Sequence, residues 1–427
     1  METFSTIPEW VKLEHEVAQL LTNQEVHGWY FDERAAWELA STLRRELEQT
    51  YQLLRDRHPY VAGSEFTPKR NNRTQGYVKD APFTRLKELN PTSRDHISWI
   101  LKTFHGWNPK QLTPTGKPII DEVVLKEMAA SGGPSIALEF LKCLNITKSL
   151  GMISEGTNAW LKLCTTASRI HHHCSVATNT HRAAHRSPNL AQVPSDERFR
   201  RLFIPSPGLR MVGADLSGIE LRMLAHYIAR HDGGRYAKLL LEDDIHQINA
   251  DKIGISRRQV KTVTYAFLYG AGDEKIGHSF DPQLSTNAAK KKGKEIRAAY
   301  VDAVEGLGEL LTAIKKASEK GFIKSIDGRK IAVDSPHKAL NYCLQSGAGV
   351  IAKRWLVINQ GIMNDIGICA SQLGFIHDEL QFECAPECTE DLSTSLVYSA
   401  TAAGEYYNMR IRIDAEATTG NNWSETH

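Results

Sequence analysis

Two short apolar segments, far apart in the sequence, each deliver an aspartate, and this pattern constrains the fold more than any other feature. Residues 210–214 predict an apolar strand that ends at Asp215. Residues 373–382 predict a tight hairpin with His377 and Asp378 at its turn. Both segments therefore indicate a sheet that presents carboxylates at its edge.

A carboxylate at a strand end has two interpretations. Taken singly, Asp215 or Asp378 is most simply a turn or cap residue. Brought together, two carboxylates repel each other and raise one pKa unless divalent cations neutralise them, and such oxygen ligands suit Mg²⁺. Two such ions, about 3.5–4 Å apart, can activate a hydroxyl and stabilise a leaving oxygen. The pair is thus a candidate metal site.

A helix predicted at residues 257–269 carries the second candidate group. Arg257, Lys261, Tyr265 and Tyr269 recur every four residues and form a slowly drifting stripe on one face. Two cations a turn apart can grip a triphosphate, and two aromatic rings can stack on a base. The alternative is an amphipathic helix with a solvated basic end and a buried aromatic end.

The rest of the chain predicts an α+β protein with more than one domain. Its 427 residues are about three times a typical domain. Helical periodicity dominates to about residue 163, and the first two helices are expected to pack antiparallel. Residues 58–91, rich in Pro, Gly, Asn, Lys and Arg, predict a solvated loop, whereas 322–333 predict a hairpin.

The distribution of charge and cysteine indicates the kind of binding partner and the cellular compartment. The net charge is only +2, but residues 169–210 hold seven Arg and five His against two acidic residues, a composition that suits a polyanion. Seven scattered cysteines indicate a reducing, cytoplasmic compartment. No apolar run of about 18 residues predicts a membrane span.

Three motifs, in this order, resemble motifs A, B and C of the family A DNA polymerases. They are DLSGIELR (215–222), RRQVKTVTYAFLYGAG (257–272) and FIHDELQ (375–381). TNTHRAAHRSPNLAQVP (178–194) and ALNYCLQSGAG (339–349) also match, and the wording is similar to that of T-seven-like phage replicative enzymes. The resemblance runs from about residue 10 to the last residues of the chain.

The resemblance implies a right-hand polymerase with an antiparallel palm sheet and helical fingers and thumb. Residues 1–164 would form the thumb, with a shortened insertion at about 58–91. The palm would comprise 165–224 and 338–427, and the fingers 225–337 with the helix 257–269. The activity implied is template-directed 5′–3′ addition of deoxynucleotides to a primer, with pyrophosphate release, in phage DNA replication.

The same resemblance assigns roles to the metal and nucleotide residues. Asp215, Asp378 and the backbone carbonyl of Leu216 would hold two Mg²⁺ ions, for which Mn²⁺ can substitute. The residues that would bind the incoming triphosphate or its base and sugar are Arg257, Lys261, His246, Tyr265 and Tyr269. Lys261 would also protonate the pyrophosphate leaving group.

DNA contacts are implied for a further group of residues. Minor-groove acceptors and the primer end would be read by Arg182, Asn341, Gln345 and His377, and Arg329 is assigned to the same DNA-binding set. His181 stands where the family often has glycine, which removes backbone freedom and adds a possible phosphate or base contact.

Glu220 has two interpretations that can coexist. Ser217 and Glu220 fit the S-x-x-E capping box at the start of a helix, and spacing alone favours that role. The resemblance instead implies that Glu220 is a steric gate that excludes the 2′-hydroxyl of a ribonucleotide.

Partners and rival functions follow from what the chain contains. Only about 15 residues precede the first matched helix, so this chain is not expected to proofread, and a separate exonuclease or processivity factor is a candidate partner. The shortened insertion argues against dependence on thioredoxin. The alternatives are an idle primer-template binding module that needs a partner, an RNA-synthesising polymerase and a two-metal nuclease.

A final cluster, His171-His172-His173-Cys174, suggests metal binding at first sight. Adjacent residues on an extended segment alternate faces, and no second group of ligands has zinc-site spacing. We therefore expect ordinary packing at these residues. The run 290–294, rich in lysine, is expected to be a solvated helix start, with a template-phosphate contact as the alternative.

Overall fold

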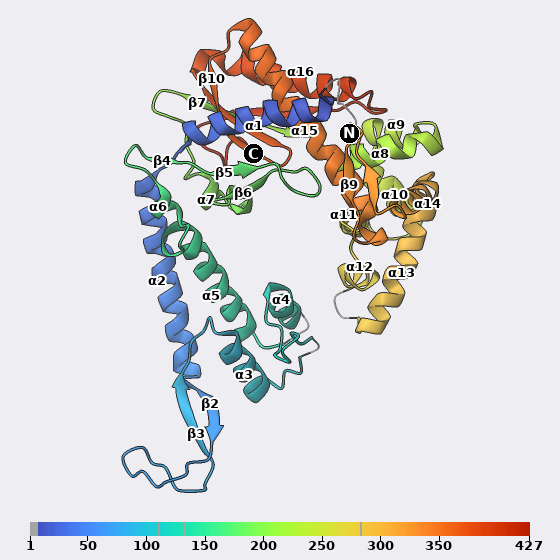
Figure 1. The fold of residues 1–427 in the computed structure, drawn as a ribbon. Coiled ribbons are helices and arrows are strands. Elements are labelled where there is room, and N and C mark those ends of the chain that lie inside the picture. The colour runs from blue at the N-terminus through green and yellow to red at the C-terminus, as the bar shows by residue number, and fades with distance from the viewer. Residues whose placement is uncertain (1–6, 110, 131–132, 282–283) are drawn as a thin grey trace, which may run out of the picture. The chain divides into compact units, whose positions relative to one another are not determined.

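The computed structural model describes residues 7–109, 111–130, 133–281 and 284–427 (Figure 1). The chain divides into two compact units, one of residues 34–162 and one of residues 1–33 and 163–427. Residues 1–6, 110, 131–132 and 282–283, which fall in the predicted thumb and fingers, lie outside the described residues.

The larger unit is built around a four-stranded antiparallel sheet in the order β10-β11-β7-β12. Its strands are β7 (Arg210–Leu216), β10 (Ala370–Ile376), β11 (Glu379–Cys384) and β12 (Ala415–Gly420). The predicted strand and the predicted hairpin are both confirmed. In the register of β11 on β7, Glu379 lies opposite Asp215, and Leu380 lies opposite Ala214.

Alternation along the two central strands gives the sheet one apolar and one polar face. The apolar side chains belong to one buried core: Val212, Ala214, Leu216, Leu380, Phe382 and Cys384. The residues between them point the other way, and in β11 they are Glu379, Gln381 and Glu383. Period two therefore places Glu379 on the same face of the sheet as Asp215, opposite it in the ladder.

Helices bury the apolar face and enclose the core (Figure 1). α1 (Glu9–His27) packs on β10 and on α15 (Ala339–Ile366), while α16 (Thr389–Tyr406) packs on α15, β7 and β12. The indole of Trp355 is fully buried in this core and donates to the Leu396 carbonyl at 2.8 Å. The strand that carries Asp215 and the hairpin that carries Asp378 are therefore packed against a buried helical core.

A helical segment follows motif A, from residue 219 to residue 318. Its helices are α8 (Ile219–Asp232), α9 (Arg235–Glu242), α10 (Ile245–Ile253), α11 (Arg257–Leu268), α12 (Asp273–Phe280), α13 (Thr286–Ala303) and α14 (Leu307–Ser318). The hairpin of β8 (Phe322–Lys324) and β9 (Lys330–Ala332) confirms the prediction for 322–333. The exposed lysines of the 290–294 run lie inside α13 rather than at its start.

Short elements complete the larger unit. They are α7 (Glu197–Arg200) and two antiparallel pairs, β1 (Trp29–Tyr30) with β4 (Arg169–Ile170) and β5 (His173–Ser175) with β6 (Ala184–Arg186).

The unit of residues 34–162 has its own apolar core, which includes Leu54, Ile97, Ile100, Phe140 and Leu141. Its helices are α2 (Glu33–Arg57), α3 (Arg94–His105), α4 (Glu122–Ala130), α5 (Ile136–Leu150) and α6 (Trp160–Leu163), with a π-helical turn at Gly151–Glu155. α1 contributes to the core of the larger unit and α2 to the core of this one, and the antiparallel packing of the two helices stays a prediction.

The predicted loop at 58–91 contains an antiparallel hairpin, β2 (Tyr60–Phe66) and β3 (Phe83–Glu88), which corrects the prediction. Most side chains of these strands are exposed, so no alternation of apolar and polar residues was present to reveal them. Phe66, Tyr77 and Phe83 form a cluster of edge-to-face aromatic contacts at its far end.

A buried ion cluster joins α1, α15 and the β8–β9 hairpin. Lys353, which is fully buried, donates to both carboxylate oxygens of Glu14 at 2.7 and 2.8 Å. Arg329 also pairs with Glu14, and its Nε donates to Asp327 at 2.6 Å. Arg329 is only 4% exposed, so its placement does not support the predicted direct contact with DNA.

Replacement of Glu14 by Gln is expected to lower the free energy of unfolding by about 3 kcal/mol, because it leaves the fully buried Lys353 ammonium without its paired carboxylate. Denaturant unfolding monitored by circular dichroism measures the change. Glu16→Gln is the matched control, since Glu16 is half-exposed and lies 3.9 Å from Arg354. Equal stability of the two variants would contradict a structural role for the cluster.

No helix among the described residues is long and apolar enough to cross a membrane.

Candidate active site

The two predicted aspartates are brought together by the backbone. The Leu216 N–H at the end of β7 donates to the Asp378 carbonyl at 3.0 Å, which ties motif A to the turn of the β10–β11 hairpin. His377, in the same turn, has a left-handed φ of 62°. Asp215 lies opposite Glu379 across the ladder. The structure therefore collects at least three carboxyl groups where the central strands β7 and β11 meet the hairpin turn.

The electrostatics of this edge are those of crowded carboxyls. Burial and the negative charges of Asp378 and Glu379 raise the pKa of Asp215 to about 7. Burial and the charge of Glu220 raise the pKa of Asp378 to about 6, against the opposing influence of Arg182. Both carboxyl groups are thus poised to gain from a nearby cation.

Glu379 and His427 are neighbours of Asp215 that sequence reasoning missed. Asp215, Glu379 and His427 offer ligand atoms that all lie within 4.8 Å of one another. The His427 ring nitrogen Nδ1 is 2.9 Å from Glu379, and the Trp423 indole donates to the other oxygen of Glu379 at 2.5 Å. Counting alternate residues back along β11 would have placed Glu379 on the face of Asp215.

Gly213 explains how the chain near its end covers this polar face. A Cβ at Gly213 would lie 2.2 Å from the Thr426 carbonyl oxygen and 2.3 Å from the Gln381 amide nitrogen. The Thr426 hydroxyl donates to the Gln381 side chain at 2.7 Å. A glycine at this position therefore permits the close approach of Thr426 to the polar face of the sheet.

Glu220 does not cap its helix, which corrects the favoured interpretation. The N-cap of α8 is Gly218, with no side-chain capping hydrogen bond. Instead, Glu220 accepts from Arg182 Nη2 at 2.9 Å and from the Tyr269 hydroxyl at 3.0 Å. The carboxylate is therefore turned toward residues predicted to bind DNA and nucleotide.

Helix α11 exposes both cations of the predicted stripe near its start. A capping box formed by Ser256 and Gln259 starts the helix, a signal that we missed. Arg257 is exposed and donates to Asp244 at 2.6 Å, and Lys261 is exposed one turn later.

Tyr265 is half-buried, with its ring centroid 6.3 Å from that of His246. Burial lowers the pKa of His246, whose Nδ1 is buried without a hydrogen-bond partner among the described residues. His246, Arg257 and Tyr265 are thus neighbours, as a shared nucleotide site requires.

The predicted DNA-contacting residues lie on different elements. Asn341, on α15, donates to the Leu268 carbonyl at 2.9 Å and so fixes the end of α11, while Gln345 lies one turn further along α15. His181 adopts a left-handed φ of 61°, and its Nδ1 is 2.8 Å from the Ser346 hydroxyl. That ring is therefore held by the protein.

In the absence of divalent cations, the contribution of Asp215 and Asp378 to the free energy of unfolding is expected to fall as the pH rises from about 4 to about 7. The native state keeps protons on Asp215 and Asp378 in this window, whereas the unfolded state has lost them. Urea unfolding in chelator at about pH 5 and about pH 8 measures the trend. Asp215→Asn should lose less stability over this interval than the parent, and identical losses would contradict the assigned pKa shift.

Comparison with known proteins defines the class to which this fold and site belong. The model of DNA polymerase family A matches residues 64–425. The chain therefore belongs to DNA polymerase family A. It is 32% identical to the DNA-directed DNA polymerases of Enterobacteria phage T3 and Escherichia phage T7, over 98% of this chain and 70% of each relative.

The fold is also similar to that of a solved structure. The polymerase domain of Pol1 from M. smegmatis, solved as a complex with DNA primer-template and dNTP, has a TM-score of 0.78. The similarity covers 96% of this chain and 70% of that one at 20% identity, and it shows that the α+β fold is shared.

Proposed function

We propose that this chain is a DNA-directed DNA polymerase that extends a primer 3′-hydroxyl from deoxynucleoside triphosphates and releases pyrophosphate, in phage DNA replication. The observation that carries the proposal is the union of Asp215 and Asp378 at one sheet edge, in a chain that belongs to family A. The phage relatives at 32% identity support the assignment.

The donor chemistry of the edge fits a hard divalent cation. Carboxylates whose pKa values are raised by crowding gain most from Mg²⁺ or Mn²⁺, and Asp215 and Asp378, with the Leu216 backbone carbonyl, would hold two such ions. When bound, the ions would supply Lewis-acid activation of the primer hydroxyl and charge neutralisation at the phosphates. Glu379 and His427 lie beside Asp215 and are further candidates for holding the site together.

The exposed cations of α11 would bind the triphosphate. Arg257 pairs with Asp244, and both side chains are about half exposed, so this ion pair contributes little free energy. An incoming phosphate would displace the Asp244 carboxylate at small cost. Lys261 would contact the phosphates and give a proton to the leaving pyrophosphate, and His246 would complete the grip. Tyr265 would lie near the nucleotide sugar and base.

Selection of the sugar and of the base pair would depend on the residues around Glu220. Because Glu220 accepts hydrogen bonds from both Arg182 and Tyr269, the three side chains would border the nucleotide together. Glu220 would exclude a 2′-hydroxyl. Asn341, Gln345 and His377 remain candidates for contacts with the primer-template. Arg329 is reassigned to the buried ion cluster.

The thumb, fingers and palm are assigned from the resemblance to family A polymerases. Residues 1–164 are the proposed thumb, 225–337 the fingers, and 165–224 with 338–427 the palm. Within this scheme, residues 1–33 belong by their contacts to the unit that contains the palm sheet, which favours moving the thumb boundary to about residue 34.

Primer extension on a primed DNA template with Mg²⁺ tests the proposal against its rivals. Extension with dNTPs but not with NTPs supports a DNA polymerase. Extension with NTPs would favour RNA synthesis, and degradation of the primer without synthesis would favour a nuclease. Binding of primer-template without extension would favour a binding module that needs a partner.

The setting and partners are also proposals. All seven cysteines are described and free, which supports a reducing compartment such as the host cytoplasm. A separate exonuclease or processivity factor remains a candidate partner, and lack of proofreading and of thioredoxin dependence stay predictions.

A further inference from the structure

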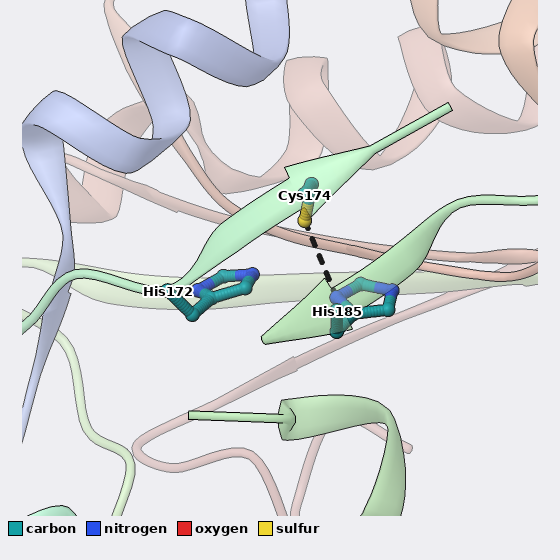
Figure 2. A group of neighbouring side chains, drawn as sticks. All are labelled: His172, Cys174 and His185. Carbon is teal, nitrogen blue, oxygen red and sulfur yellow. Dashed lines mark hydrogen bonds between the residues drawn. The ribbon is translucent and has the colours of Figure 1, made fainter. Parts of the chain in front are cut away.

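A second group of metal-binding side chains lies beside the catalytic sheet, on the small β5–β6 pair. His172 precedes β5, Cys174 lies in it, and His185 lies in β6 (Figure 2). Cys174 and His185 are direct partners in the ladder. All three residues are buried, with exposed fractions of 1% for His172 and 8% for the other two.

The expectation of ordinary packing at the His-rich run rested on the alternation of neighbouring residues. Alternation does separate neighbours on an extended segment, but it also brings His172 and Cys174, two residues apart, to one side. The third member comes from the paired strand, eleven residues after Cys174, a spacing that zinc-motif patterns do not include.

The ligand atoms converge on one point. In Figure 2, a nitrogen of each ring and the Cys174 sulfur face one another, and one ligand atom from each residue lies within 4.8 Å of the others. Cys174 Sγ is 3.2 Å from His185 Nδ1. In a tetrahedral zinc site a sulfur and a nitrogen ligand are separated by about 3.5 Å, given Zn–S of about 2.3 Å and Zn–N of about 2.0 Å.

The ring nitrogens with partners in the cluster are His185 Nδ1, beside Cys174, and His172 Nε2, beside Gln24. The other nitrogen of each ring is buried without a hydrogen-bond partner among the described residues. Gln24, on α1, closes another side, with its amide nitrogen 3.1 Å from His172 Nε2 and 3.3 Å from Cys174 Sγ.

We propose that His172, Cys174 and His185 form a zinc site, distinct from the Asp215 edge and independent of the proposed polymerase activity. Two imidazoles and one thiolate are a donor set that favours Zn²⁺ over Mg²⁺. Three protein ligands would leave the fourth position of a tetrahedral site to water.

The protonation states fit this role. Burial lowers the pKa of His172 to about 3 and of His185 to about 4, so both rings are neutral and offer lone pairs. Burial raises the pKa of the Cys174 thiol to about 12. Binding therefore forms the Zn–S bond, breaks the S–H bond and releases one proton to solvent, with no change of oxidation state.

The position of the cluster suggests that a bound metal would have a structural role. It joins α1 through Gln24 to both strands, and the His185 ring lies edge-on to the ring of His377, with centroids 6.0 Å apart. His377 precedes Asp378 in the hairpin turn, so a metal here would steady the strand pair that borders that turn.

Titration of the metal-free, reduced full chain with Co²⁺ and then with Zn²⁺, in excess Mg²⁺, tests the proposal. We expect one equivalent of Co²⁺ to give a sulfur-to-cobalt charge-transfer band that Zn²⁺ abolishes, and Zn²⁺ to raise the melting temperature. Cys174→Ser should remove the band and weaken Zn²⁺ binding by at least about 10²-fold. Cys369→Ser, at an exposed free thiol, is the matched control and should behave like the parent.

His185→Asn is the second variant, and far-ultraviolet circular dichroism shows whether each protein is folded. In a folded chain, this variant should also lose tight Zn²⁺ binding. Absence of the charge-transfer band in the folded parent would overturn the proposal. So would a band that persists in both Cys174→Ser and His185→Asn, since the metal would then be bound elsewhere.

Discussion

Replacement of Asp378 by Ala is expected to lower the rate of primer extension by at least about 10³-fold, because it removes a metal ligand whose contribution to charge stabilisation is several kcal/mol. The Asp378 backbone carbonyl still accepts from Leu216, so the hairpin turn and the sheet should persist. Single-turnover extension of a labelled primer in Mg²⁺ measures the loss.

Asp365→Ala is the matched control, since Asp365 is exposed near the end of α15. It should extend primers at the rate of the parent. Fluorescence anisotropy with labelled primer-template should show that Asp378→Ala still binds DNA. If the variant kept a tenth or more of the parental rate, Asp378 would not be an essential metal ligand.

Replacement of Glu220 by Ala is expected to reduce discrimination against ribonucleotides by about 10²-fold, since it removes the bulk that would meet a 2′-hydroxyl. The same change frees Arg182 and Tyr269, each of which donates to this carboxylate. Steady-state incorporation of a single dNTP or NTP, compared as kcat/KM ratios, measures the effect.

Glu220→Gln separates bulk from charge. It keeps the size of the side chain and an oxygen that can accept from Tyr269. A steric gate predicts that Gln preserves sugar selectivity while Ala loses it. If Ala leaves selectivity unchanged but lowers dNTP use, Glu220 serves only to hold Arg182 and Tyr269.

The motif-bearing elements could be predicted because their signals are local. The strand 210–214, the hairpin around Asp378 and the helix from Arg257 each carry a clear period and a turn or start signal, and the structure has all three. The family motifs then placed the chain in DNA polymerase family A, which the match over residues 64–425 confirms.

What sequence reasoning missed depends on partners that are distant along the chain. Ser217 and Glu220 have capping spacing, yet Glu220 bonds to Arg182 from another segment. Arg329 was assigned to the DNA-binding set, yet it is almost fully buried and pairs with Glu14 and Asp327. His185 completes a cluster with His172 and Cys174 only because β5 and β6 pair in one register. Tertiary pairing, which periodicity does not encode, decides each case.

The register of β11 places both the residues that fill the core and the residue that borders the candidate active site. One set of residues, Leu380, Phe382 and Cys384, fills the core, and the interleaved set faces the other way, with Glu379 opposite Asp215. A shift of one residue along the ladder would exchange the two sets. Insertions within this strand would therefore cost the fold as well as the active site, so the strand admits substitution far more readily than a change of length.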